Sequence, residues 1–259
     1  MSPSGLRNPT IVNEFWRIVS DHKITLVAGV PTALSAVLQV PIKDNNITSI
    51  RKGLTGAALL PPAVGESFRK ITGGHLYEIL GMTEASGLVS IDPLSGPGSV
   101  GSVGWALPYT KVDILRLNDD GSLGKPCGIN EIGVIAIHGE HVSPGYLNKK
   151  QNNGVFNNKY LNSGDLGYKD SKGRIYIAGR AKDLIIRSGH NIDPSMIENA
   201  MTTHPAVSIA AAVGMPDEYS GELPICFVEL LPDLTISEDE LHQHATKTIN
   251  ERPAWPKVI

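Results

Sequence analysis

Short apolar runs alternate with helical patterns over the first 80 residues of this 259-residue chain, and this alternation constrains the fold more than any other feature. Residues 15–19 carry an apolar stripe at helical spacing, and residues 24–30 form a short apolar run that ends at Gly-Val-Pro. Residues 33–40 are helical again, and a second strand-and-helix pattern covers residues 50–80. Alternation of this kind predicts a largely parallel sheet with helices on its faces.

The pattern changes near residue 92, where the helical stripes stop. Residues 93–104 are rich in Gly, Ser and Pro, and this composition predicts a loop. Short strand-like runs divided by turn signals follow the loop at residues 111–117, 132–138 and 173–178. Runs of this length with Asp and Gly between them predict a small β-rich subdomain.

The last part of the chain begins with a helix signal at Asp193, because Asp favours the N-cap position and a proline follows at the first helical position. Ser237 and Glu240 have the spacing of a capping box, which predicts that a final helix starts directly after Ser237. Strand-like runs lie between these helices at residues 207–213 and 225–231, joined by an expected loop of Gly, Asp and Pro. This order of elements predicts a small α+β domain.

Together these patterns predict an α/β fold divided into two domains, and 259 residues are enough for that arrangement. We expect residues 1–181 to form a large domain, with an α/β part over residues 1–95 and a β-rich part over residues 96–181. Residues 182–259 are expected to form the small α+β domain.

Composition and charge argue against several classes of protein. The net charge is −3, so the chain lacks the basic footprint of a nucleic-acid-binding protein. No apolar run approaches the roughly 20 residues of a membrane span, and the N-terminus lacks the basic and apolar segments of a signal peptide. The two cysteines, Cys127 and Cys226, show neither metal-type spacing nor a disulfide framework. We therefore expect a cytoplasmic protein without a nucleic-acid partner or a transmembrane segment.

Two short motifs carry residues suited to nucleotide chemistry. The first ends in Thr83-Glu84, where a hydroxyl followed by a carboxylate in a tight turn can hold a phosphate oxygen and a divalent metal. The same pair can also cap a helix. In the second motif, Asp165 lies at a Gly turn, where a carboxylate can accept two hydrogen bonds from a ribose diol. A plain Asx-turn would use the same residue type.

Residues 179–192 form the longest segment of this kind. Arg180 could bind ribose or phosphate oxygens through its forked guanidinium group. Lys182 and Asp183 lie between two strand-like runs, where a two-residue connection is either a hairpin turn or a hinge. Gly189 leaves the backbone open to a ligand, because glycine has no side chain to obstruct it. Taken alone, the segment favours a hairpin with charged tips over a ligand site.

These motifs belong to an ordered set that extends over nearly the whole chain. Its members are residues 27–32, 56–61, 81–84, 131–139, 144–146, 163–165 and 179–192. Their order and spacing resemble the adenylate-forming superfamily, which contains acyl-CoA synthetases, luciferases and peptide-synthetase adenylation domains. The last segment is most similar to acyl-CoA and acetyl-CoA synthetases.

The resemblance implies an ATP-dependent acid–thiol ligase. In that family a carboxylate, here expected to be a fatty acid, attacks the α-phosphate of Mg²⁺-bound ATP to give an acyl-adenylate and pyrophosphate. CoA then displaces AMP, so ATP, Mg²⁺ and CoA are the implied cofactor and substrates. The implied fold is the distal part of the large AMP-binding domain followed by a small, mobile and truncated C-terminal domain.

The resemblance also implies roles for individual residues. Those implied to bind ATP or AMP are Ala57, Ala58, Leu59, Gly81, Met82, Thr83, Asp165 and Arg180. Within this set Asp165 would bind the ribose hydroxyls, with Arg180 beside it. Thr83 and Glu84 would be catalytic, and Glu84 would ligate Mg²⁺. Lys182 would be the hinge between the domains, and Ser188 and Gly189 would flank the path of the CoA pantetheine.

The sequence departs from the family pattern at several points. A Ser/Thr/Gly-rich phosphate loop ending in Pro-Lys-Gly and a catalytic lysine in a Gly-Lys motif are both absent from these 259 residues. Lys257 matches an earlier Pro-Lys position, Leu80 replaces an aromatic residue at the adenine, and Asn191 replaces an arginine near the phosphate. We therefore expect a fragment that is inactive alone. The alternatives are an adenylation domain that loads a carrier-protein thiol, and a non-catalytic nucleotide-binding fragment.

Overall fold

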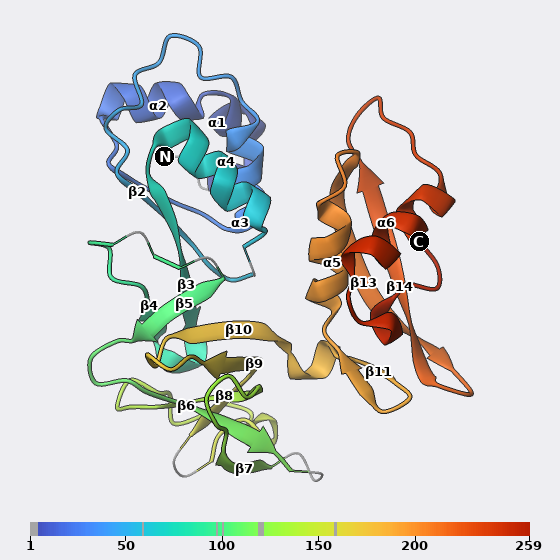
Figure 1. Ribbon diagram of the computed structural model, residues 1–259. Helices are drawn as coiled ribbons and strands as arrows, with labels where there is room; N and C mark the ends of the chain where they lie inside the picture. The colour runs from blue at the N-terminus through green and yellow to red at the C-terminus, as the bar shows by residue number, and fades with distance from the viewer. Residues whose placement is uncertain (1–4, 59, 97, 100, 119–121, 158–159) are drawn as a thin grey trace. The chain divides into compact units, whose positions relative to one another are not determined.

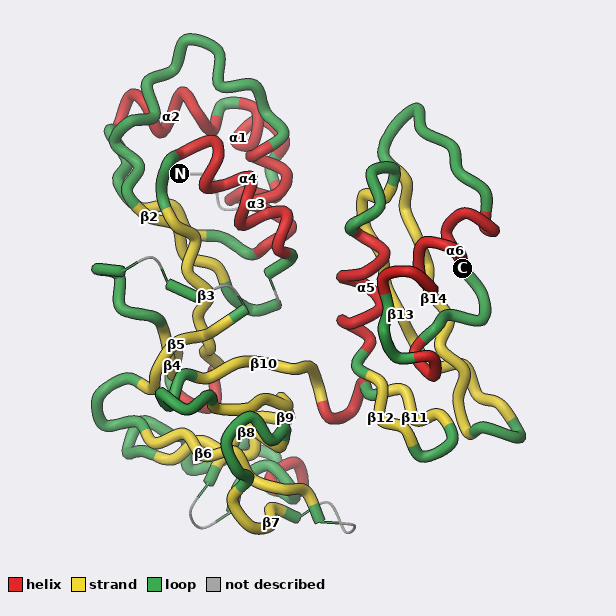
Figure 2. The backbone as a smooth tube through the Cα atoms, in the orientation of Figure 1, coloured by secondary structure: helices red, strands yellow, loops and turns green. Residues whose placement is uncertain are grey.

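A computed structural model describes residues 5–58, 60–96, 98–99, 101–118, 122–157 and 160–259 (Figures 1 and 2). The chain divides into two compact units. Unit 1 consists of Met1–Ser163 and Gly167–Ile177, and unit 2 consists of Gly164–Leu166 and Ala178–Ile259. The domain boundary expected after residue 181 remains a prediction, because a division into compact units does not identify a hinge.

The first part of unit 1 is a short parallel sheet with helices packed against it (Figure 1). Its strands are β1 (Leu26–Ala28), β2 (Lys52–Thr55) and β3 (His75–Met82), paired in parallel. Its helices are η1 (Gly5–Arg7), α1 (Pro9–Asn13), α2 (Phe15–His22), α3 (Pro31–Leu38) and α4 (Pro62–Thr72). Their common core contains Trp16, Val19, Val27, Leu34, Ile50 and Phe68. The predicted α/β fold class is confirmed.

Strand β3 changes partner halfway along its length. Its residues 75–78 pair in parallel with β2, and its residues 79–82 pair in antiparallel fashion with β4 (Gly87–Ile91). The other strands of the sheet are β5 (Ser102–Ala106), β6 (Lys111–Leu117), β7 (Leu123–Pro126), β8 (Gly133–His138), β9 (Leu161–Lys169) and β10 (Ile175–Arg180). In hydrogen-bonded order the sheet reads β1-β2-β3-β4-β5-β10-β9-β8-β6-β7. The β-rich part therefore continues the sheet of the α/β part.

A second core lies under the antiparallel strands. Its fully or nearly buried members are Leu80, Ala85, Val89, Val103, Val112, Ile114, Ile135, Ile137, Leu161 and Ile175. Short helical turns η2 (Thr83–Ala85) and η3 (Lys149–Asn152) complete this part of the unit. Leu80 is only 4% exposed and packs in this core. Its side chain therefore contributes to the packing beneath the turn that follows β3.

The loop expected over residues 93–104 is only partly correct, because β5 begins at Ser102. Ser102 and Val103 are buried, and β5 pairs with both β4 and β10. The glycines and serines suggested a loop, yet they serve close packing here. Gly104 has φ = +73°, and a Cβ atom at this position would lie 2.0 Å from the backbone nitrogen of Asp92. The strand thus needs glycine at that position.

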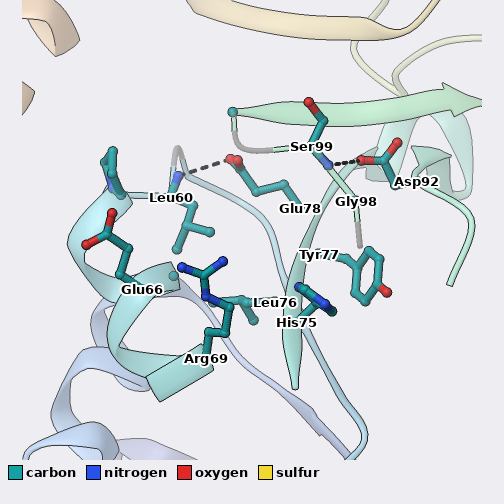
Figure 3. Close-up of a pocket in the computed structure, with 13 residues that line it drawn as sticks. Leu60, Glu66, Arg69, His75, Leu76, Tyr77, Glu78, Asp92, Gly98 and Ser99 are labelled. Carbon is teal, nitrogen blue, oxygen red and sulfur yellow. Dashed lines mark hydrogen bonds between the residues drawn. The ribbon is translucent and has the colours of Figure 1, made fainter. Parts of the chain in front are cut away.

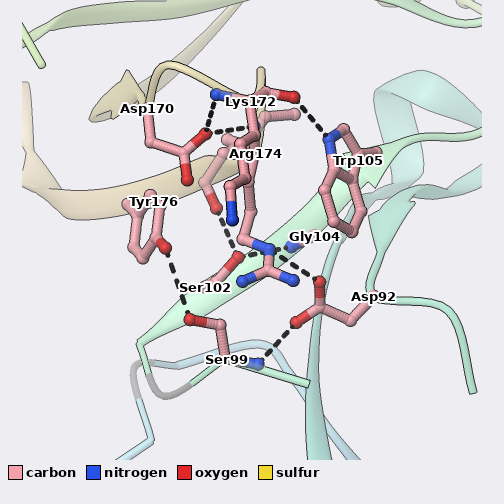
Figure 4. Close-up of polar contacts among 10 residues, drawn as sticks. Asp92, Ser99, Ser102, Gly104, Trp105, Asp170, Lys172, Arg174 and Tyr176 are labelled. Atoms are coloured by element: carbon pink, nitrogen blue, oxygen red, sulfur yellow. Dashed lines mark hydrogen bonds and ion pairs between the residues drawn. The ribbon is translucent and has the colours of Figure 1, made fainter. Parts of the chain in front are cut away.

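A polar cluster fixes β5 between β4 and β10 (Figure 4). The Arg174 Nε atom lies 3.1 Å from Asp92 Oδ1, and the guanidinium group stacks 4.5 Å from the centre of the Trp105 ring. Neither Arg174 Nε nor Asp92 Oδ1 has a hydrogen-bond partner, so the contact between them is ionic. The Ser102 hydroxyl donates to the carbonyl oxygen of Ile175 at 3.0 Å. Asp92 is only 3% exposed, and its carboxylate also accepts a hydrogen bond from the Ser99 nitrogen at 2.9 Å.

Unit 2 is a small α+β structure. Its strands are β11 (Ile185–Arg187), β12 (His190–Ile192), β13 (Val207–Asp217) and β14 (Gly221–Leu230), in the order β12-β11-β14-β13. Its helical segments are η4 (Ala181–Asp183), α5 (Pro194–Thr202), α6 (Glu238–Thr248) and η5 (Arg252–Ala254). Its separate core includes Ile185, Ile197, Met201, Leu241 and Ala245.

Both predicted helix starts in unit 2 are confirmed. The Asp193 side chain accepts a hydrogen bond from the backbone nitrogen of Ser195 at 3.0 Å, so Asp193 caps α5. Ser237 and Glu240 form the reciprocal contacts of a capping box at α6. By contrast, the loop expected between residues 213 and 225 is mostly strand. The hairpin of β13 and β14 continues to the pair Asp217 and Gly221. Pro216 and Pro224 occupy paired positions within these strands, so the prolines do not end them.

Candidate functional site

The turn after β3 presents Thr83 and Glu84. Gly81 lies where β3 meets β4 closely, and a Cβ atom there would come within 2.7 Å of the carbonyl oxygen of Gly87. The turn closes through a 3.0 Å hydrogen bond from the Ser86 nitrogen to the Thr83 carbonyl oxygen. Thr83 is exposed and Glu84 is partly exposed, so both are available to a ligand. The predicted residues Gly81, Met82, Thr83 and Glu84 are thus consecutive members of one β-turn-β element.

A segment about 60 residues farther along the chain holds this turn. The Tyr146 hydroxyl donates to Glu84 Oε1 at 2.5 Å, and this hydrogen bond raises the pKa of the tyrosine above its ordinary value. The Ser143 nitrogen donates to the Glu84 carbonyl oxygen at 2.8 Å. Sequence reasoning placed Tyr146 in one of the ordered motifs but gave it no role. The only sequence signal that pointed to Tyr146 is its place in the motif of residues 144–146.

The loop after β2 is held by a buried carboxyl group. Ala57 and Ala58 are exposed, and Ala57 has φ = +69°, which is uncommon for a residue with a side chain. Leu59, predicted beside them, lies outside the described residues. The Leu60 backbone nitrogen donates to Glu78 Oε1 at 3.0 Å. Glu78, on β3, therefore fixes the loop that follows the neighbouring strand.

A cavity of about 270 Å³ opens beside Glu78 (Figure 3). It is lined by Leu60, Pro62, Gly65, Glu66, Arg69, His75, Leu76, Tyr77, Glu78, Asp92, Gly98, Ser99 and Gly101. Glu78 is 7% exposed, and burial raises its pKa from the ordinary value to about 7, although the Leu60 hydrogen bond acts in the opposite direction. Sequence reasoning missed both Glu78 and the cavity, because a lone Glu in an apolar run gives no distinctive pattern.

Glu78→Gln should remove a pH-dependent loss of stability. Because the folded-state pKa lies above the unfolded one, Glu78 adds most stability below about pH 4.5, and this is lost as the pH rises to about 7. The shift corresponds to on the order of 3 kcal/mol. The free energy of unfolding should be measured with urea at pH 5 and at pH 8 for both proteins. Relative to the wild type, the variant should be more stable at pH 8 than at pH 5 by an amount of this order. Glu66→Gln, on the exposed side of the same cavity, should keep the wild-type pH dependence. Equal pH dependence in Glu78→Gln would show that the buried carboxyl does not titrate as described.

The second group of predicted residues lies in unit 2, where Asp165 and Arg180 form an ion pair. Arg180 Nη1 lies 3.0 Å from Asp165 Oδ1, and the Asp165 side chain is 13% exposed while that of Arg180 is 50% exposed. Burial raises the pKa of Asp165, and the attraction of Arg180 only partly offsets this. Gly164 beside Asp165 has φ = +75°, so the turn needs a residue tolerant of that conformation. The structure thus brings Asp165 and Arg180 together.

The remaining predicted residues of unit 2 are exposed. Lys182 lies in η4, directly after Arg180 and Ala181. Ser188 and Gly189 form the tip of the hairpin between β11 and β12, with φ values of +48° and +80°. The Ser188 nitrogen donates to the Ser220 carbonyl oxygen at 2.7 Å, which ties this tip to the turn between β13 and β14.

Two structural features are absent from the described residues. No group of three or more His, Cys, Asp or Glu side chains is arranged to hold a metal ion in the part of the chain that the structure describes. Within that same part, no helix has the length and apolar character required to cross a membrane.

Comparison with known proteins identifies the family. Residues 3–147 match the AMP-binding enzyme family, and residues 196–259 match the C-terminal domain of AMP-binding enzymes. The chain is 41% identical over 256 residues to marinolic acid–CoA ligase from Pseudoalteromonas sp. (strain SANK 73390), covering 98% of this chain and 39% of that protein. It is 36% identical over 234 residues to long-chain-fatty-acid–CoA ligase from Bacillus subtilis (strain 168), covering 90% and 41%.

A solved structure shows the same fold. O-succinylbenzoate coenzyme A synthetase (MenE) from Bacillus subtilis, in complex with ATP and a magnesium ion, has a TM-score of 0.80 and 28% identity. The similarity covers 95% of this chain and 50% of that one. The chain therefore spans about two fifths to one half of the length of these relatives. On these matches, the chain belongs to the family of AMP-binding enzymes.

Proposed function

We propose that this chain is part of an AMP-forming acyl-CoA synthetase, which activates a carboxylate with ATP and transfers the acyl group to CoA. The observation that carries the proposal is the Thr83-Glu84 turn, which presents a hydroxyl and a carboxylate side by side and is fixed from a distant segment by Tyr146. The relatives named as CoA ligases support the reaction class. A fatty acid is the proposed carboxylate, as in the name of the Bacillus subtilis relative.

Each predicted residue has a part in this proposal. Ala57, Ala58 and Leu59 would form one wall of the adenine and acyl pocket. Gly81, Met82 and Thr83 would wrap the AMP phosphate, since the turn exposes the Thr83 side chain. Asp165 would bind the ribose, and its ion pair with Arg180 would hold the carboxylate in place. Lys182 is the proposed hinge, and Ser188 and Gly189, at an exposed hairpin tip, would flank the pantetheine.

The donor set at Glu84 fits Mg²⁺. This ion keeps several water ligands and is usually held by one or two carboxylates together with substrate phosphates, so it does not require a cluster of protein side chains. Tyr146 occupies Glu84 Oε1, and the second carboxylate oxygen remains for a metal. When bound, Mg²⁺ would neutralise charge on the ATP phosphates during attack by the carboxylate.

The ribose assignment can be tested by binding. Asp165→Asn should weaken AMP binding by about 10- to 100-fold, because a hydrogen bond to a charged group contributes roughly 1.5–3 kcal/mol. Isothermal titration calorimetry of the purified chain with AMP measures this change. Glu229→Gln, an exposed change on β14, should bind AMP as the wild type does.

A second nucleotide separates ribose recognition from general damage. The wild type should bind 2′-deoxy-AMP more weakly than AMP, whereas Asp165→Asn should no longer distinguish the two nucleotides. If Asp165→Asn lowers both affinities equally and retains the distinction, the carboxylate does not contact the ribose hydroxyls. Normal AMP binding by the variant would likewise reject the assignment.

A further inference from the structure

We propose that Tyr146 is a positioning residue that orients the Glu84 carboxylate for Mg²⁺. This inference rests on the proposed function, because it requires Glu84 to bind the metal of Mg²⁺-bound ATP. The observation behind it is direct, since the Tyr146 hydroxyl donates to Glu84 Oε1 at 2.5 Å. The hydrogen bond occupies one carboxylate oxygen, and we infer that the second one binds the metal.

Tyr146 is itself held in place on two sides. Its ring packs edge-to-face against Phe156, with 5.2 Å between ring centres and an interplanar angle of 81°. Its backbone nitrogen donates to Asn152 Oδ1 at 2.7 Å. Gly145 has φ = +131°, and a Cβ atom there would lie 2.5 Å from Asn152 Nδ2. Because residue 145 is a glycine, the backbone can approach Asn152 closely. The contacts with Asn152 and Phe156 together hold Tyr146, and so its hydroxyl, in one position.

The backbone of the metal-binding turn is fixed from the same segment. The Ser143 nitrogen donates to the Glu84 carbonyl oxygen at 2.8 Å. The Ser86 hydroxyl donates to the His141 carbonyl oxygen at 2.7 Å. Residues 141–146 therefore restrain both the main chain and the carboxylate of Glu84, and the hydrogen bond to that carboxylate comes from the Tyr146 side chain.

The chemistry explains why such a restraint matters. A glutamate side chain has several rotatable bonds, and holding it in one orientation costs conformational entropy when the metal binds. A hydroxyl that already fixes the carboxylate removes part of that cost before binding. Groups that orient metal ligands in this way typically change metal affinity by about 10- to 100-fold when they are removed.

The critical variant is Tyr146→Phe, which keeps the ring and its contact with Phe156 but removes the hydroxyl. Mn²⁺ serves as the probe, and electron paramagnetic resonance measures free Mn²⁺ during titration of the purified protein with ATP present. The expected result is about 10- to 100-fold weaker Mn²⁺ affinity. Affinity for ATP measured without metal should be unchanged, because the hydroxyl acts only through Glu84.

A matched control exists in the same unit. The Tyr160 hydroxyl, just before β9, donates to Asp113 Oδ2 on β6 at 2.5 Å, so this tyrosine–carboxylate hydrogen bond has the same length. Tyr160→Phe removes that hydrogen bond and should leave Mn²⁺ affinity at the wild-type value. A loss of equal size in both variants would mean that the effect is general destabilisation, and this would overturn the inference.

Glu84→Gln separates failure of the inference from failure of the proposed function. If Glu84→Gln loses Mn²⁺ binding and Tyr146→Phe does not, Glu84 is a ligand and Tyr146 does not position it. If Glu84→Gln binds Mn²⁺ as the wild type does, the metal role of Glu84 is wrong and the inference falls with it. Loss in both variants, with Tyr160→Phe normal, supports the inference.

Discussion

A polypeptide of these 259 residues alone is expected to catalyse carboxylate-dependent ATP–pyrophosphate exchange at least about 10²–10³ times more slowly than a full-length relative. Two groups of the family pattern are missing from these residues: the phosphate loop ending in Pro-Lys-Gly and the lysine of the Gly-Lys motif. Both would stabilise negative charge on the phosphates during adenylate formation. Losing a single preorganised donor of this kind typically costs about 10²–10³ in rate, and two losses need not add.

The comparison enzyme for this measurement is the long-chain-fatty-acid–CoA ligase of Bacillus subtilis, which is 36% identical to the chain. Exchange should be measured over several fatty-acid chain lengths, so that a poor choice of substrate is not mistaken for inactivity. AMP binding should persist in the same preparation, because Asp165 and Arg180 are present and paired. Exchange at roughly 1 s⁻¹ or faster would contradict the prediction.

Local signals explain the parts of the fold that could be predicted from the sequence. The caps at Asp193 and Ser237 depend on residues two or three positions apart, so their spacing in the sequence is their spacing in the helix turn. The parallel strands β1, β2 and β3 are likewise separated by helical patterns that the sequence displays. The sequence contains no comparable pattern from which the register of the antiparallel strands could be predicted.

Close backbone packing explains the main error in the fold. Residues 102–104 have the composition of a loop, but Ser102 turns its hydroxyl to a neighbouring strand and Gly104 admits the backbone near Asp92. In these positions small residues serve contact with other strands. Sequence patterns report local preference, and here tertiary packing outweighs it.

The candidate site was predictable in its motifs but not in its supports. Thr83 and Glu84 are neighbours in the chain, so their joint presentation followed from the motif. The contacts that fix the site connect Tyr146 to Glu84 and Glu78 to Leu60, which are 62 and 18 residues apart. No periodic pattern encodes such pairs, because each depends on how the strands are placed.

Gly104→Ala, which adds one methyl group to β5, should strongly destabilise the protein. An added Cβ would lie 2.0 Å from both the Asp92 nitrogen and the Ile91 carbonyl carbon, and these are backbone atoms that cannot rotate away. The φ of +73° adds strain for any residue with a side chain. The strand cannot slide to relieve the overlap, because the ion pair of Asp92 with Arg174 and the Ser102 hydrogen bond hold both sides (Figure 4).

We expect Gly104→Ala to destabilise unit 1 by more than about 4 kcal/mol, which is in the range that marks a severe packing or strain defect. Gly101→Ala is the matched control, since Gly101 has the same φ of +73° but, among the residues that the structure describes, nothing lies within 4 Å of the added carbon. It should cost only the conformational strain, about 1–2 kcal/mol. Urea unfolding followed by tryptophan fluorescence measures both, and a Trp255→Phe background restricts the signal to Trp16 and Trp105 of unit 1.

The difference between the two alanine variants isolates the steric term. Both substitutions remove the same glycine freedom at the same backbone angle, so their common cost cancels and the overlap with Ile91 and Asp92 remains. The core of unit 2 contains none of these residues, and its unfolding should be unchanged in either variant. Equal stabilities for Gly104→Ala and Gly101→Ala would mean that β5 does not lie against the end of β4 as described. A large difference between the free energies of unfolding of the two variants would support the contact between β5 and the end of β4. It would also support the path of β5, the strand that separates β4 from β10.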